Sequence, residues 1–285
     1  MELLDYDFMR RALVAAVLVG LAAPAVGVFL VQRRLTLIGD GLGHVAVAGV
    51  ALGLVLGGAP LVAAAAVTVG AAVAMELIRL KGHASGEIAL ALLFYGGLAG
   101  GVVLVSRAPS GSRNLDAYLF GAITTTSTRD LVTFAVLTVV VMGLAVGLRR
   151  ELFAVSNDEE QAMAAGLPVV TLNLLLVVLT ALTVVVSMRI VGVLLISALM
   201  VVPVATAQQV APSFRATFVV AVIVGVVVSV SGVVTSYYAD TPSGGTIVVL
   251  AIAVFALVAL LTGAMGWRRQ RRVALPILTD SENDW

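Results

Sequence analysis

An aspartate and a histidine stand four residues apart in the apolar stretch "IGDGLGHVAVAGVALG", residues 38–53. On an α-helix, residues i and i+4 lie on one face, with their Cβ atoms about 5–6 Å apart. Asp40 and His44 can therefore both reach one small cation. A carboxylate with an imidazole suits zinc and tolerates manganese or iron, whereas the absence of sulfur ligands argues against a copper(I) path. The pair predicts a transient metal site.

Two other interpretations of this pair stay open from the residues alone. Asp40 lies near the expected start of a helix and could cap it, and a lone histidine is often a hydrogen-bonded packing residue. The opposite face of the same helix carries Gly49, Gly53 and Gly57, and Gly49 is about 180° round from Asp40 at 3.6 residues per turn. A ladder of small residues predicts close packing against another helix.

Two further carboxylates are candidates for the same layer of the membrane. If the helix with Asp40 runs outward, the next span runs inward and ends at Arg79, which brings Glu76 near the depth of Asp40. Glu87 opens the following span on the same side. We therefore expect Glu76 and Glu87 as additional metal ligands, with an ion pair between Glu76 and Arg79 or Lys81 as the alternative. His83 is expected in a loop.

The elements that must position these groups are membrane helices. The chain has 285 residues, of which 61% are hydrophobic and 12% charged, against about 25% charged in a soluble domain. We predict an all-α polytopic membrane protein, an importer-type bundle of about eight or nine spans in one permease domain covering residues 1–285. Apolar runs of about 20 residues give nine candidates: 12–32, 38–57, 60–78, 87–106, 130–148, 169–188, 191–210, 216–236 and 245–266. The run at 191–210 holds Pro203 and is expected to be short or broken.

Charges and cysteine content narrow the function classes. No cleavable signal peptide is evident, cysteine is absent, and a net charge of +1 argues against nucleic acid as a partner. With the amino terminus outside, eleven of the seventeen Lys and Arg residues face the cytoplasm, including those of a cytoplasmic tail at 267–285. Membrane lipid is the expected surrounding.

Two stretches read as non-spanning. Residues 107–129 predict an external loop with a short helix. Residues 151–168 predict a short cytoplasmic helix, capped by Ser156, with acidic residues in its first turn and a stop at Gly166 before Pro168. This helix is either a solvated connector or a docking helix for a soluble partner. Its candidate coupling residues are Asp158, Glu159, Ala162, Met163 and Gly166, with Ala162 and Met163 expected to be buried by the partner.

Five sequence blocks resemble the zinc/manganese-type ABC-transporter permeases in order and spacing over residues 8–265. They are "RRLTLIGDGLGHVAVAGVALG", "NLDAYLFGAI", "DEEQAMAAGLPV", "MRIVGVLLISALMVVPVATA" and "ADTPSGGTIVVL".

The resemblance implies a homodimeric permease in the bacterial cytoplasmic membrane. It also implies separate ATPase subunits below and an extracytoplasmic metal-binding protein above. Asp40 and His44 fall on the family's Asp-x-x-x-His block for the translocated metal, and residues 156–169 fall where the ATPase contact helix is expected. No permanently bound cofactor is implied, only transported zinc or manganese. Glu87 stands where many relatives have small or apolar residues.

Competing functions follow from the same residues. Lys81 is the one lysine of the chain, and no G-x-x-x-x-G-K-[ST] pattern precedes it, so the chain is not expected to be an enzyme of the phosphate-loop ATPase kind. The alternative to a passive permease is a self-sufficient, ion-coupled secondary transporter, with Asp40, Glu76 and Glu87 as a relay. An intramembrane metalloenzyme is disfavoured because no H-E-x-x-H motif occurs.

Overall fold

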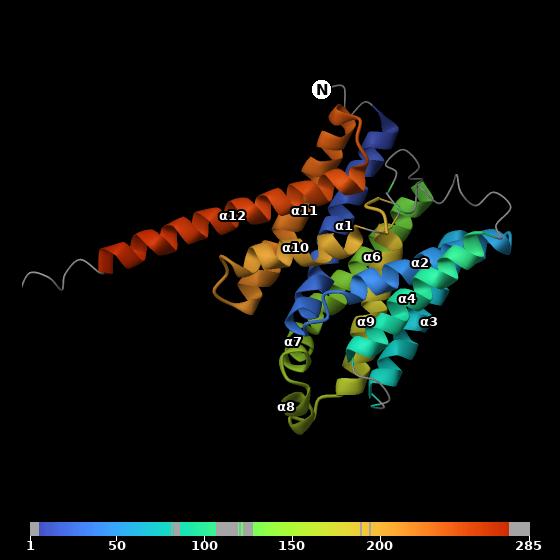
Figure 1. Cartoon of the computed structure of the whole chain (residues 1–285), viewed down its shortest axis with the longest axis horizontal. Coiled ribbons are helices and arrows are strands. Elements are labelled where there is room, and N and C mark those ends of the chain that lie inside the picture. The colour runs from blue at the N-terminus through green and yellow to red at the C-terminus, as the bar shows by residue number, and fades with distance from the viewer. Residues whose placement is uncertain are drawn as a thin grey trace, which may run out of the picture.

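The computed structural model is a bundle of α-helices (Figure 1). It describes residues 6–80, 82, 86–106, 119, 121, 128–188, 190–193 and 195–273, without the side chains of 86–87, 128–130 and 265–273. The helices are α1 (Asp7–Gln32), α2 (Ile38–Val55), α3 (Pro60–Leu80), α4 (Gly86–Val105), α6 (Thr128–Gly147), α7 (Arg149–Asn157), α8 (Glu159–Ala164), α9 (Val169–Ser187), α10 (Ile196–Gln208), α11 (Phe214–Ala239) and α12 (Ser243–Val273).

Seven of the described helices are long and apolar enough to cross a membrane: α1, α2, α3, α4, α9, α11 and α12. An eighth span is formed if the pair Leu131–Gly147 and Arg149–Asn157, bent by 70°, counts as one. The chain is therefore a multi-pass membrane protein. These eight elements coincide with eight of the nine predicted apolar runs.

The ninth run, residues 191–210, differs from a simple span, in line with the sequence-based expectation for this run. Its helical part is the 13-residue α10, which at 1.5 Å per residue is about 20 Å long and shorter than a hydrocarbon core of about 30 Å. Gly192 has a φ of +85°, a conformation that glycine adopts without strain and that ends the preceding turn.

Glycine contacts set how the neighbours of α2 approach it. A Cβ on Gly49 would lie 2.6 Å from Cα of Ala64, and one on Gly53 would lie 2.6 Å from Cα of Pro60, so α2 and α3 run antiparallel in close contact. The predicted ladder is correct for these two residues. Gly57 lies beyond the end of α2, has a φ of +65° and has no atom within 4 Å of its built Cβ, so its predicted place in the ladder is wrong.

The remaining helices divide into two sides around α1, which is largely buried. Figure 1 shows α2, α3 and α4 together on one side of the molecule and α11 and α12 on the other, with α7 and α8 at the lower end. The first turn of α1 lies at the opposite end from α8. The bundle thus holds α2 between α3 and α4, and holds the short helices α7 and α8 beneath it.

Candidate functional site

Asp40 and His44 lie in the first turns of α2, on one helical face, and both side chains are half-buried. The residue at the N-cap of α2 is Leu37, and no side chain makes a capping hydrogen bond there. Among the described residues, neither Asp40 nor His44 makes a hydrogen bond or ion pair with a side chain. Within the described residues, therefore, Asp40 does not cap α2, and His44 packs against Phe94 without a hydrogen bond to a side chain.

Helix α4 forms the wall opposite these two groups. A Cβ on Gly97 would lie 2.7 Å from the backbone nitrogen of Val45 and 3.0 Å from the carbonyl carbon of His44, so α4 approaches α2 closely at the histidine. Gly41 meets the side chains of Leu90 and Leu93. Because these residue numbers rise together, α2 and α4 run parallel.

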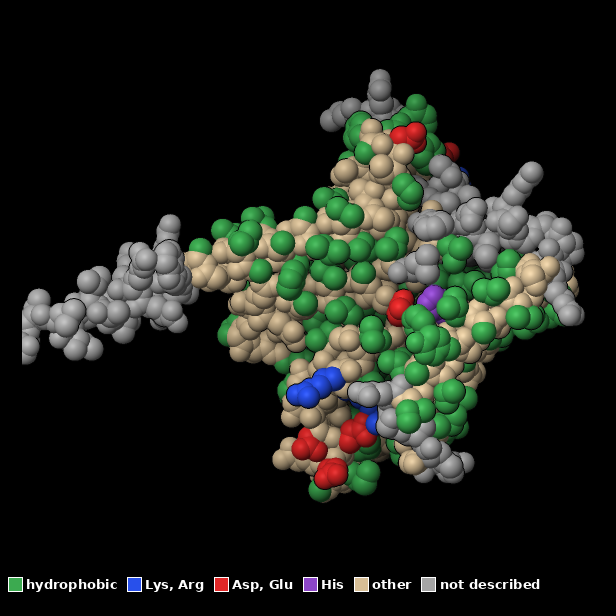
Figure 2. All heavy atoms as spheres, viewed as in Figure 1, with side chains coloured by type: hydrophobic (Ala, Val, Ile, Leu, Met, Phe, Trp, Pro, Cys, Tyr) green, Lys and Arg blue, Asp and Glu red, His purple; other side chains and the backbone are tan. Residues whose placement is uncertain are grey.

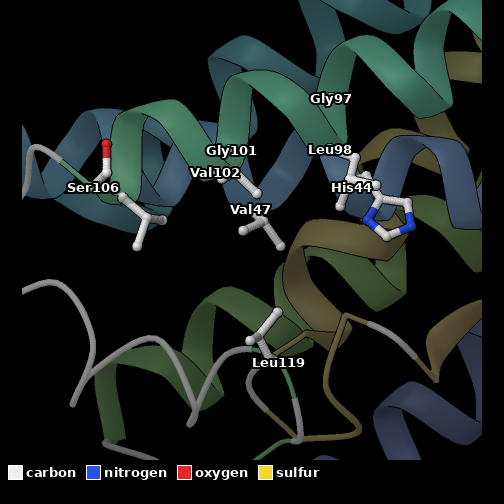
Figure 3. A pocket seen from close by; sticks show the side chains of 9 residues that line it. His44, Val47, Gly97, Leu98, Gly101, Val102, Ser106 and Leu119 are labelled. Carbon is white, nitrogen blue, oxygen red and sulfur yellow. The ribbon is translucent and has the colours of Figure 1, made fainter.

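Two cavities adjoin the pair. One, of about 440 Å³, extends from His44 along α4 to Ser106 and is also lined by Leu119 (Figure 3). The other, of about 400 Å³, is lined by Asp40 together with Leu37, Leu90, Ala91, Phe94 and Tyr95. In Figure 3 the imidazole stands at one end of a cavity whose other labelled residues are apolar, glycine or serine.

Phe94 lies between His44 and the cavity beside Asp40. Its ring meets the His44 ring edge-on, with centroids 4.5 Å apart and planes at 75°, and it also lines the cavity beside Asp40. This contact packs the imidazole of α2 against α4. Phe94 was missed in the sequence because an aromatic residue in an apolar span carries no signal of its own.

Asp40 and His44 do not belong to a larger group of candidate metal ligands among the described residues. No group of three or more His, Cys, Asp or Glu side chains that could hold a metal occurs in the described part. The structure brings Asp40 and His44 together but does not bring Glu76 to them as a third ligand. The side chain of Glu87 lies outside the described residues.

Glu76 belongs to a different cluster. It is fully buried, and its two carboxylate oxygens accept hydrogen bonds from Arg79, at 2.7 Å from Nη2 and 3.0 Å from Nε. The ion pair with Arg79, which the sequence left as an alternative, is thus the observed one. A carboxylate held on both oxygens by a guanidinium is a poor ligand for a passing cation. The expectation that Glu76 joins Asp40 at the metal finds no support in the described geometry.

The cytoplasmic segment contains two helices where one was predicted. Helix α7 continues from the bend after α6, and Asp158 then caps α8 with a hydrogen bond from the Gln161 amide to Oδ1, at 2.9 Å. The predicted cap, Ser156, is buried in the last turn of α7 instead. Gly166 ends the segment with a φ of +80°, as predicted, because glycine adopts this left-handed conformation without strain.

The two residues expected to face a partner differ in exposure. Ala162 is buried against the chain itself, whereas Met163 is 62% exposed. The expectation that both are available to an ATPase is therefore wrong for Ala162, which the body of the permease already covers. Figure 2 shows acidic side chains gathered at this lower end of the molecule, with basic side chains just above them, while a histidine and an acidic side chain lie side by side near the middle of the same face.

The chain matches a known protein family over most of its length. The model of the ABC 3 transport family matches residues 5–262. The chain belongs to this family. It is 36% identical to a "Probable metal transport system membrane protein" of Treponema pallidum (strain Nichols) over 262 residues, which cover 91% of this chain and 97% of the relative.

Other proteins similar to this chain are named for the metal that they transport. The chain is 28% identical to the manganese transport system membrane protein MntC of Halalkalibacterium halodurans, covering 95% of this chain and 94% of the relative. It is 29% identical to the high-affinity zinc uptake system membrane protein ZnuB of Haemophilus influenzae, covering 88% and 97%. These relatives place the chain among multi-pass membrane permeases of metal transport.

A solved structure of the family has the same fold. PsaBC from Streptococcus pneumoniae, in complex with Fab, superposes with a TM-score of 0.81 at 31% sequence identity and covers 90% of this chain and 92% of that chain. The all-α permease fold is thus confirmed.

The predicted external loop at 107–129 lies outside the described residues except for Leu119, Gly121, Thr128 and Arg129, and the tail is described only as far as Val273.

Glu159 takes part in a partly buried network of charged side chains. Its carboxylate accepts hydrogen bonds from Arg33, from Arg79 at 2.9 Å and from Asn173 at 3.2 Å. Arg79 also holds Glu76, so four charged side chains and one amide are joined. The sequence offered Arg79 as a possible ion-pair partner of Glu76, but it gave no sign that Arg33 and Arg79 both meet Glu159.

The network keeps Glu159 ionised. Burial by itself raises the pKa of this carboxyl, but hydrogen bonds from Arg79 and Arg33 and the positive charges of both outweigh burial and hold the pKa below its ordinary value. A cavity of about 240 Å³ adjoins the network and is lined by Arg33, Leu35, Arg79, Val155, Ser156, Asn157 and Glu159.

Proposed function

We propose that this chain is the membrane-spanning subunit of an ATP-driven importer of divalent transition-metal ions, with Asp40 and His44 as transient ligands of the cargo. The observation that carries the proposal is the state of this pair. A carboxylate and an imidazole share one face of a membrane helix beside two cavities, and neither has a polar partner among the described residues. Ionisable groups inside a membrane are costly, so an unpartnered pair is best explained by a ligand that comes and goes.

Two copies of the chain would complete the site. A transition metal such as zinc takes about four ligands, and each chain offers two. A two-fold symmetric dimer that brings the α2–α4 face of one copy against the other would supply two carboxylates and two imidazoles around one axis, because an isologous interface presents the same residues twice. The proposed cargo is zinc or manganese, which carboxylate and imidazole ligands both suit.

Work would enter through the cytoplasmic segment. The sequence has no phosphate-binding loop, and α8 is a capped helix at the end of the molecule away from the start of α1. In this proposal separate ATP-binding cassette subunits bind the exposed side of α8 at Met163, and an extracytoplasmic metal-binding protein delivers the ion at the other end. Met163→Glu would then release the ATPase from the purified complex.

The decisive experiment is reconstitution. The permease, its genomically adjacent ATPase and the neighbouring metal-binding protein are placed in sealed proteoliposomes, and uptake of radioactive zinc or manganese is measured with ATP and with a non-hydrolysable analogue. Uptake that requires hydrolysis and persists when ionophores collapse proton and sodium gradients supports the proposal. Uptake by the permease alone, driven by a gradient, would instead support the secondary transporter.

A further inference from the structure

Glu159 faces the body of the permease, although it lies on the helix expected to meet the ATPase. Its side chain is 33% exposed, and its carboxylate binds Arg33, Arg79 and Asn173. Its neighbour Glu160 is exposed and makes no ion pair or hydrogen bond with a described side chain. The two adjacent glutamates of α8 therefore differ in role: one is attached to the membrane helices and the other is not.

The attachment reaches three separate parts of the bundle. Arg33 lies at the C-cap of α1, Arg79 in the last turn of α3, and Asn173 in α9. The Arg33 side chain is 4% exposed, so its charge depends on Glu159 for compensation inside the protein. Movement of α8 relative to the bundle must either carry Arg33 with it or leave a buried cation without its partner.

Arg33 is also joined to the metal ligands by a short and constrained linker. Only residues 33–37 separate α1 from α2. The amide of Leu35 donates to the Leu30 carbonyl at 2.9 Å, and Arg34 has a φ of 59°, so the linker is a tight turn. Asp40 follows in the first turn of α2. A displacement of Arg33 is therefore delivered directly to the start of the helix that holds Asp40 and His44.

We propose that Glu159 is a positioning residue that transmits the movement of α8 through Arg33 to the start of α2, and that it is not itself a contact of the ATPase. Arg79, which lies in the last turn of α3, forms a second branch that passes the same movement directly to that helix. This inference rests on the proposed function, since it assumes an ATPase that moves α8. It assigns to Glu159 a role opposite to that of Met163, because the former faces the bundle and the latter faces away.

The test compares two neighbouring isosteric changes, Glu159→Gln and Glu160→Gln, in the reconstituted complex. Three quantities are measured: ATPase co-purification, ATP hydrolysis, and metal ions taken up per ATP hydrolysed. For Glu159→Gln we expect normal co-purification and hydrolysis within about twofold of wild type, with uptake per ATP reduced about tenfold or more, in the range of direct pair couplings. The matched control Glu160→Gln removes the same charge from the same helix and should change uptake per ATP much less.

A charge exchange identifies the partner. The double variant Glu159→Arg with Arg33→Glu keeps the net charge, and we expect its uptake per ATP to exceed that of either single variant about threefold or more. Recovery of this kind requires an interaction between the two positions and would not follow from a general loss of folding. A double variant no better than the weaker single would overturn the proposal.

Poor folding of Glu159→Gln is covered by the neutral pair Arg33→Gln with Glu159→Gln, which leaves no unpaired buried charge. We expect this pair to insert and to hydrolyse ATP while coupling poorly. Normal uptake per ATP in the neutral pair, or release of the ATPase by Glu159→Gln, overturns the proposal. Wild-type complex in the same vesicles separates the two ideas: if it shows no ATP-dependent uptake, the proposed function fails, whereas wild-type-like coupling in the variants makes only this inference fail.

Discussion

The metal-ligand region on α2 and the charged network beneath it use the same chemical groups in opposite ways. Glu76 is engaged by Arg79 of its own helix, and Glu159 by Arg33 of α1 and Arg79 of α3, with several hydrogen bonds each. Asp40 and His44 have cavities beside them and no polar partner among the described side chains. A carboxylate bound by a guanidinium holds helices together, whereas one left open inside a membrane is available to a cation. Whether an acidic side chain is paired with an arginine, more than its residue type or its depth, separates the structural carboxylates from the one proposed to bind metal.

The largest expected effect comes from substituting Asp40 or His44, which have no polar partner among the described side chains. Asp40→Asn and His44→Ala should each lower metal uptake at least about 100-fold, because each removes one of the two ligands that the proposed site takes from a chain, while insertion and ATPase binding stay normal. Uptake at matched expression is the measurement. Asp240→Asn is the matched control, since Asp240 is exposed at the end of α11 with a φ of 50° that asparagine tolerates. Wild-type uptake in both site variants would remove the metal assignment.

Breaking the ion pair between Glu76 and Arg79 should lower the stability of the permease more than it lowers transport. Glu76→Gln leaves the guanidinium of Arg79 with a weaker acceptor in a buried position and should cost about 2–3 kcal/mol. We expect a melting temperature lower by about 5 °C or more for the purified permease. The metal affinity of the variant that does fold should stay unchanged. A selective loss of metal binding without loss of stability would instead place Glu76 at the ion.

The exit from α8 offers a smaller effect with a clean control. Gly166 has a φ of +80° and no atom within 4 Å of its built Cβ, so only backbone strain opposes substitution there. Gly166→Val should strain the turn by about 1–2 kcal/mol and weaken ATPase co-purification severalfold. Gly166→Asn, which adopts this conformation more readily, should behave nearly as wild type. Equal loss in both variants would point to a direct contact at this position.

The smallest expected effect is a flat pH response of the network. Because the pKa of Glu159 is held below its ordinary value, its contribution is fully present above the ordinary glutamate pKa of about 4.3 and is lost only as the pH falls through the lowered value. We therefore compare the metal uptake per ATP hydrolysed by wild type with that of Glu159→Gln. The ratio of these two values should not change between about pH 5 and pH 8. A ratio that falls within that window would show that Glu159 is not held by its arginines as described.

Much of this molecule was predictable from the sequence, for local reasons. Runs of apolar residues about 20 long specify membrane helices, because the bilayer demands internally paired backbone over that length. Asp40 and His44 were found because their spacing of four is a property of the helix alone. Gly166 followed from turn chemistry. The expectation of a short or broken run at 191–210 was correct, but it rested on Pro203, which lies inside α10, and the sequence did not place the turn at Gly192.

The mistaken expectations concern how side chains pair and pack once the chain is folded. The depth argument for Glu76 was reasonable, since α2 and α3 are antiparallel, yet the Arg79 guanidinium takes up both of its oxygens. Ala162 looked free for an ATPase because a six-residue helix does not show which side the bundle covers. Ser156 and Asp158 were equally good caps by type, and the 70° bend after α6 left Ser156 inside α7.

The sequence by itself determined that the chain spans a membrane many times, that it carries one carboxylate–imidazole pair on a helical face, and that it lacks a phosphate-binding loop. Each of these follows from composition or from spacing within one segment. Only the tertiary structure decided that Glu159 meets Arg33 across 126 positions of sequence, that Phe94 abuts His44, and that Asp40 is left open. Which acids are paired depends on how separate helices pack, and side-chain pairing between helices leaves no periodic mark in either of them.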